Sequence, residues 1–143
     1  DAGDEFMGSL FYTQYRGAAE LAVMKAWGCE AMTLGNHEFD NGAANLARFI
    51  GGADFPILAA NIDARREPEL DGRLRPWWAA MKGGARIAFI GVTTPETPLL
   101  SSPGRNLAFT DPAEAASRAI AEIRATGPAT RPPRPGRRRR SSP

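Results

Sequence analysis

Apolar residues recur along the chain with two kinds of spacing, which predict helices that alternate with short buried strands. Helical spacing of the apolar positions occupies residues 9–27, 43–50 and 111–127. Short apolar runs bounded by turn residues predict strands at 30–34, 57–60, 77–81 and 86–92. Strands that alternate with helices are typical of layered α/β domains, so the sequence predicts an α/β fold.

Caps and turn residues mark several of the expected boundaries. Ser9 can cap the start of the first helix, and Gly28 can end it. Asp111, followed by Pro112, has the pattern of an N-cap with proline at the first helical position. The strands at 77–81 and 86–92 flank two glycines and are therefore expected to form a β-hairpin. Because its second strand is almost wholly apolar, we expect that strand to be central in the sheet.

Two segments follow neither spacing. Residues 63–75 are mostly polar and include Pro68 and Gly72, which predicts a surface loop. Residues 93–110 contain three prolines and predict an irregular connection.

Composition is that of a folded domain. The 143 residues are 43% hydrophobic, which is enough for one domain with a real core. Cys29 is the single cysteine, so no internal disulfide can form, and we expect it to occupy a small apolar position at a helix end. No apolar run approaches the length of a membrane span.

Charge separates the chain into two parts. Residues 127–143 hold six of the 18 basic residues and no acidic residue, which leaves 12 basic and 16 acidic residues in 1–126. The predicted domain is therefore mildly acidic, and we expect no specific nucleic-acid partner. The 127–143 segment is rich in Arg, Pro, Gly and Ser, and is predicted to be a disordered tail, read out of frame. Binding of nucleic acid or an anionic surface by that tail is the alternative.

One loop concentrates chemistry-bearing side chains. The segment Gly35-Asn36-His37-Glu38-Phe39-Asp40 follows a predicted strand and contains the only histidine of the chain. Asn36 offers a neutral oxygen ligand to a divalent cation, and His37 can donate a proton near neutral pH. Asp40 can hold the imidazole in one tautomer and orientation. This combination indicates metal-assisted hydrolysis of a phosphate ester.

A second signal opens the chain. Asp4 follows Gly3 in the sequence Asp-Ala-Gly-Asp, and the glycine lets the backbone come close to an ion or phosphate. A carboxylate on such a turn suits hard divalent cations and can bridge two of them.

These two motifs, in this order, resemble those of the calcineurin-like metallophosphoesterases, and most closely the 5'-nucleotidases. The resemblance extends over residues 1–126 and includes the apolar runs at 55–62 and 87–95. It implies a four-layered α/β/β/α sandwich, present here in part, that hydrolyses nucleoside monophosphates in nucleotide catabolism at a dinuclear site. The metals would be two divalent ions of Zn, Mn, Mg or Co, the partner a small nucleotide, and the location periplasmic or extracellular.

Carried over by motif, the resemblance gives four residues a role. Asp4 would bridge the two metals, and Asn36 would bind one metal and the substrate phosphate. His37 would stabilise the transferring phosphoryl group or protonate the leaving oxygen, and Asp40 would orient His37. Glu5 stands where the family often has glutamine.

Other blocks of the family pattern are missing. The family has an Asp-x-His block before Gly-Asp and further histidines later, and this chain has one histidine. We therefore expect a nucleotidase fragment, shortened at both ends and inactive alone. The alternative is a catalytically dead remnant that binds metal or phosphate.

Each residue also has a plainer interpretation. His37 is then a surface-loop histidine, Asp4 and Asn36 are turn residues, and Asp40 caps the following helix. The adjacent pair Trp77-Trp78 can stack on bases or pack within the hairpin, and the lack of an interleaved basic groove favours packing.

Overall fold

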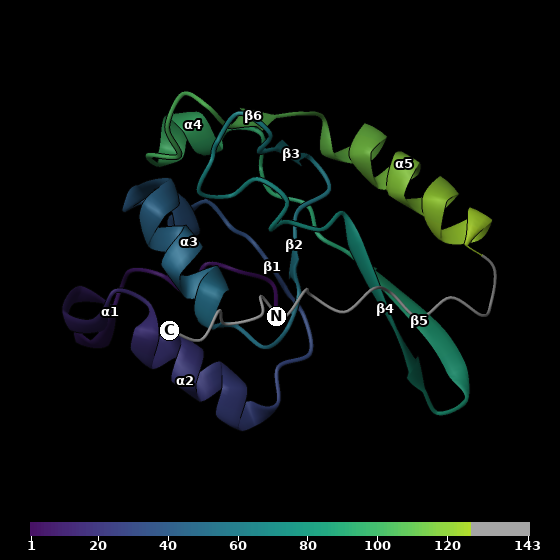
Figure 1. The fold of residues 1–143 in the computed structure, drawn as a ribbon, viewed down its shortest axis with the longest axis horizontal. Coiled ribbons are helices and arrows are strands. Elements are labelled where there is room, and N and C mark those ends of the chain that lie inside the picture. Colours follow the sequence, from purple (N-terminus) through teal and green to yellow (C-terminus); the bar gives the residue numbers. More distant parts are fainter. Residues whose placement is uncertain (127–143) are drawn as a thin grey trace, which may run out of the picture.

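The computed structural model describes residues 1–126, which form helices and short strands in alternation (Figure 1). The helices are α1 (Leu10–Tyr15), α2 (Ala18–Trp27), the 3-10 helix η1 (His37–Phe39), α3 (Gly42–Gly52), α4 (Thr97–Leu100) and α5 (Pro112–Ala125). The strands are β1 (Met32–Thr33), β2 (Ile57–Leu58), β3 (Ile62–Asp63), β4 (Trp77–Lys82), β5 (Ala85–Ile90) and β6 (Ala108–Phe109). The predicted α/β class is confirmed, whereas the predicted tail at 127–143 lies outside the described residues.

The strands of residues 1–126 pair two by two. β1 and β2 run parallel, with Met32 opposite Ile57. β3 pairs antiparallel with β6, and β4 pairs antiparallel with β5. The four-layered sandwich is not established by these three short pairs.

A hydrophobic core lies between α2, α3 and the β1–β2 pair. The aromatic ring of Phe6 packs against those of Tyr12 and Phe49, with centroid separations of 4.8 and 5.1 Å. Met32 and Leu46 are also fully buried in this cluster. Cys29 is half-buried at its edge, just after α2, as predicted.

The single helix expected at 9–27 is wrong, because the chain breaks it into α1 and α2. Arg16 and Gly17 both adopt left-handed backbone conformations, with φ of 53° and 97°. A Cβ at Gly17 would lie 2.9 Å from the ring of Phe6, so this glycine also lets Phe6 approach the break. The predicted caps are confirmed: the Ser9 side chain accepts a hydrogen bond from Tyr12 N, and Gly28 ends α2.

The β4–β5 hairpin forms as predicted, but β5 is not a central strand. Within residues 1–126 its one strand partner is β4, and Ile87 and Phe89 are 41% and 44% exposed. Figure 1 shows the hairpin extending to the side away from α1 and α2. Trp78 stacks on Phe89 across the strands at 5.9 Å, which confirms hairpin packing for this tryptophan. Apolar composition alone does not place a strand in the interior, because burial needs other segments on both faces.

The 63–75 segment is a loop, as predicted, whereas the 93–110 connection is not wholly irregular. The 63–75 loop is anchored by Leu70, which is fully buried, and the 93–110 connection contains α4 and β6. The buried side chain of Asn61 binds both ends of the 93–110 connection: its Nδ2 donates to the carbonyl oxygens of Thr93 at 2.7 Å and Thr110 at 3.0 Å. Its Oδ1 accepts from Thr93 N at 2.9 Å. Such long-range pairing of a buried amide cannot be inferred from local composition.

Candidate active site

The buried carboxylate of Glu38 holds the two predicted site loops together. Its Oε2 accepts hydrogen bonds from the backbone N–H groups of Asp4 at 2.9 Å and Gly35 at 2.6 Å. Its Oε1 accepts from Glu5 N at 2.7 Å and Phe6 N at 3.3 Å. Because hydrogen bonds to a charged group are stronger than neutral ones, this side chain fixes the 3–6 turn against the 35–40 loop.

Two glycines allow these loops to touch. A Cβ at Gly3 would lie 2.4 Å from Gly35 N, and a Cβ at Gly35 would lie 2.0 Å from Asp4 Oδ1. Asp4 itself has a φ of 60°, and its Oδ1 accepts a hydrogen bond from His37 N at 3.1 Å. The structure therefore brings Asp4 against the loop that carries Asn36, His37 and Asp40.

His37, Asp40 and Ser101 form a connected chain of hydrogen bonds. His37 Nδ1 lies 2.7 Å from Asp40 Oδ2, and Ser101 Oγ donates to Asp40 Oδ1 at 2.6 Å. The His37 side chain is 46% exposed, whereas that of Asp40 is 17% exposed. Both carboxylate oxygens of Asp40 are thus bound, one by His37 and the other by Ser101. The N-cap of α3 is Asn41 and not Asp40.

The carboxylate of Asp40 is also the main electrostatic influence on His37. Its hydrogen bond raises the pKa of His37 above the ordinary value of 6.5, and the charges of Asp40, Asp4 and Glu38 act in the same direction. Partial desolvation opposes this rise. The net effect favours the imidazolium form, which is a proton donor.

Two residues of this site were missed from the sequence. Glu38 looked like one more polar residue of the loop, and Ser101 lay in the connection that was expected to be irregular. A signal existed only for Glu38, because it is part of the Gly35–Asp40 motif that the sequence singles out. The hydrogen bond of Ser101 spans 61 positions and has no local signal.

Comparisons with known proteins identify the family. No family model matches the chain. The chain is 43% identical over 114 residues to a 5'-nucleotidase of Rattus norvegicus, a match that covers 78% of this chain and 20% of the relative. Its structure matches a 5'-nucleotidase precursor of Thermus thermophilus with a TM-score of 0.86 and 48% identity, over 89% of this chain and 25% of the other. It also matches the calcineurin-like phosphoesterase YfkN of Bacillus subtilis, with a TM-score of 0.70 and 27% identity, over 89% and 44% of the two chains.

Over most of its length the chain is similar to the calcineurin-like 5'-nucleotidases. The predicted resemblance is therefore confirmed, and hydrolase chemistry on phosphate esters is the chemistry of the family. The chain spans about a fifth of the length of the first curated relatives that it matches.

The described residues do not by themselves form the metal centre that such a family implies. Within residues 1–126, no group of three or more His, Cys, Asp or Glu side chains is arranged to hold a metal ion. Asp4 and Asn36 offer oxygen donors from the two loops that meet here, but two donors are too few for a pair of hard cations. No helix within residues 1–126 is long and apolar enough to cross a membrane.

Proposed function

We propose that residues 1–126 supply part of the active site of a 5'-nucleotidase, which hydrolyses nucleoside monophosphates to nucleoside and inorganic phosphate in nucleotide catabolism. The observation that carries this proposal is the His37–Asp40 pair beside Asp4. In the roles that the family resemblance gives them, His37 is the proton donor and Asp4 the oxygen ligand for a metal, and the two are adjacent. The relatives' names support the substrate class.

His37 has the proton chemistry that the reaction needs. Hydrolysis forms a bond between a water oxygen and phosphorus and breaks the bond from phosphorus to the ester oxygen, which must gain a proton. With Nδ1 engaged by Asp40 at 2.7 Å, Nε2 is the nitrogen left to donate that proton. Ser101, by holding the other oxygen of Asp40, limits rotation of the carboxylate and so orients the imidazole.

Asp4 and Asn36 are proposed as the contribution of this chain to a larger ligand set for two divalent ions. Asn36 is half-buried and lies in sequence between Gly35 and His37, both of which approach Asp4. A complete domain of this kind would form the four-layered sandwich and act in the periplasm or outside the cell. The 143-residue chain alone is expected to be inactive.

A chimera tests the proposal directly. The segment of the Thermus thermophilus enzyme that matches this chain is replaced by residues 1–126, since the two structures superpose with a TM-score of 0.86. The chimera should release phosphate from AMP only when a divalent metal is present. Asp4→Ala and His37→Ala in the chimera should each remove that activity, whereas Arg124→Gln on α5 should not. A folded chimera that never releases phosphate would refute the proposal.

A second candidate rests on the incomplete ligand set. The chain is then a remnant that binds metal or phosphate without catalysis. Stoichiometric binding of Mn²⁺ or Zn²⁺ by the 143-residue chain, lost in Asp4→Ala, together with a folded chimera that releases no phosphate from AMP, favours this alternative.

A further inference from the structure

A second polar network lies behind the candidate active site, between α1 and α3. The hydroxyl of Tyr12, whose side chain is buried, accepts hydrogen bonds from the Nδ2 groups of Asn41 at 2.8 Å and Asn45 at 3.2 Å. These bonds fix which way both amides face, because Nδ2 points to Tyr12 and Oδ1 points away. Asn45 is 3% exposed, so its orientation is set by the protein interior.

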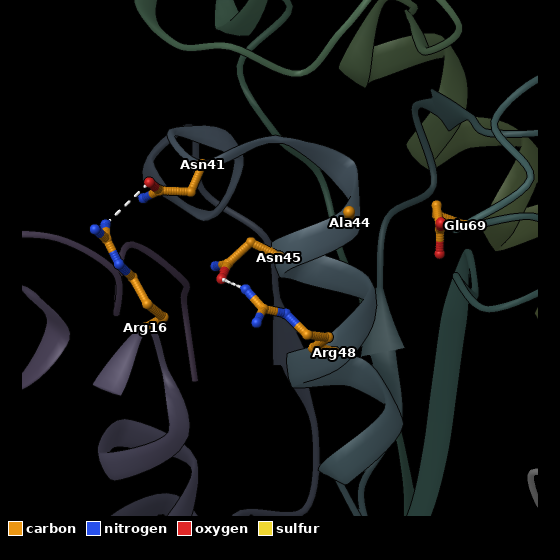
Figure 2. Close-up of a pocket in the computed structure, with 6 residues that line it drawn as sticks. All are labelled: Arg16, Asn41, Ala44, Asn45, Arg48 and Glu69. Carbon is orange, nitrogen blue, oxygen red and sulfur yellow. Dashed lines mark hydrogen bonds between the residues drawn. The ribbon is translucent and has the colours of Figure 1, made fainter. Parts of the chain in front are cut away.

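Both amide oxygens are used to hold arginines. Asn41 Oδ1 accepts from Arg16 Nη1 at 3.1 Å, and Asn45 Oδ1 accepts from Arg48 Nη2 at 2.7 Å. Figure 2 shows the two asparagines reaching toward the two guanidinium groups. A neutral amide positions a guanidinium without cancelling its charge, so each arginine keeps most of its donors for another partner.

Neither arginine is paired with a carboxylate within residues 1–126. The ion pairs of this part of the chain involve other residues. Arg16 and Arg48 nevertheless line one cavity of about 460 Å³, together with Asn41, Ala44, Asn45 and Glu69. In Figure 2 the side chain of Glu69 stands apart from the two guanidinium groups. The cavity thus has two positive charges and one negative charge on its walls.

We propose that this cavity is an oxyanion site that binds a phosphate group, either free or esterified. Planar guanidinium groups bind phosphate oxygens through paired hydrogen bonds, and their hold by amides pre-orients them for an incoming anion. The volume is in the range of small-molecule sites, so it can admit a phosphate monoester as well as inorganic phosphate.

Side-chain NMR of the full 143-residue chain tests this site. Inorganic phosphate, added at constant ionic strength against chloride, should shift the Nε–Hε resonances of Arg16 and Arg48 along one saturable curve. AMP should shift the same resonances and adenosine should not. Equal affinity for phosphate and AMP identifies the phosphate group alone as the ligand, and tighter binding of AMP extends the site to the nucleoside. The six arginines of 127–143 can also attract anions, so binding is followed at the side chains of Arg16 and Arg48 themselves.

Matched variants separate the site from general charge. Arg16→Gln and Arg48→Gln should each weaken phosphate binding at least about tenfold, which corresponds to about 1.4 kcal/mol. In each variant, binding is followed at the Nε–Hε resonance of the arginine that remains. Arg124→Gln should leave binding unchanged, and Glu69→Gln should strengthen it. All four positions are exposed, so the backbone spectrum should retain its dispersion. Shifts that do not saturate, or that persist unchanged in both cavity variants, would overturn the proposal. Because no turnover is measured, failure here is distinct from failure of the nucleotidase proposal.

Discussion

Replacing Glu38 by glutamine should strongly destabilise the chain while changing almost nothing in shape. Each carboxylate oxygen of Glu38 accepts two backbone N–H groups, from Glu5 and Phe6 on one oxygen and from Asp4 and Gly35 on the other. In Glu38→Gln one of those oxygens becomes an NH₂ group, which faces two donors and can accept from neither. Two hydrogen bonds are lost and the other two lose their charge.

The size of the loss follows from this count. Hydrogen bonds to charged groups contribute about 1.5–3 kcal/mol each, so losing two costs about 3–6 kcal/mol. Burying a neutral amide instead of a carboxylate removes a desolvation penalty, which offsets part of that cost. We therefore expect a loss of about 2–4 kcal/mol, a large fraction of the stability of an ordinary domain.

Urea unfolding of the 143-residue chain, followed by far-ultraviolet circular dichroism, measures this loss. Glu69→Gln is the matched control, because Glu69 is exposed and forms no ion pair within residues 1–126, and it should change stability by less than about 0.5 kcal/mol. If Glu38→Gln behaves like Glu69→Gln, the carboxylate does not hold the two loops together and the reasoning fails.

Three further predictions concern the same loops. Gly35→Ala places a Cβ 2.0 Å from Asp4 Oδ1 and should lower the free energy of urea unfolding by about 1–3 kcal/mol. The control Gly51→Ala changes an open helical position and should leave that free energy unchanged or raise it. Equal effects of the two variants would contradict the close approach. Asp40→Asn should lower the pKa of His37 in an NMR titration, because the Asp40 hydrogen bond is the main cause of its rise, and an unchanged titration would refute this. Since the pKa of His37 in the folded chain lies above 6.5, the small stabilisation from the His37–Asp40 pair should be complete below pH 6.5. It should be lost as the pH rises through the pKa of the folded chain. Ser101→Ala in the active chimera should lower kcat more than it raises KM, because Ser101 holds Asp40 rather than the substrate, and a change in KM alone would argue against this positioning role.

Local signals predicted most of the secondary structure. The Asp111 cap is present, with its side chain accepting from Glu114 N at 2.8 Å, and the glycine pair after Lys82 forms the hairpin turn. These features depend on neighbours in sequence, which is why spacing and residue type suffice. The break at Arg16 and Gly17 was missed because the apolar spacing continues across it, and the close approach of Phe6 to Gly17 shows only in the folded chain.

The sequence by itself determined the family resemblance, the α/β class and the loop that carries Asn36, His37 and Asp40, because these follow from short motifs and local periodicity. The tertiary structure alone decided what supports that loop. The four hydrogen bonds to Glu38 and the bond from Ser101 to Asp40 join residues 32 to 61 positions apart, except for the one from Gly35. The arginine cavity between α1 and α3 arises in the same way. A buried polar group must find a partner wherever the folded chain offers one, and that partner is set by packing in space rather than by distance along the chain.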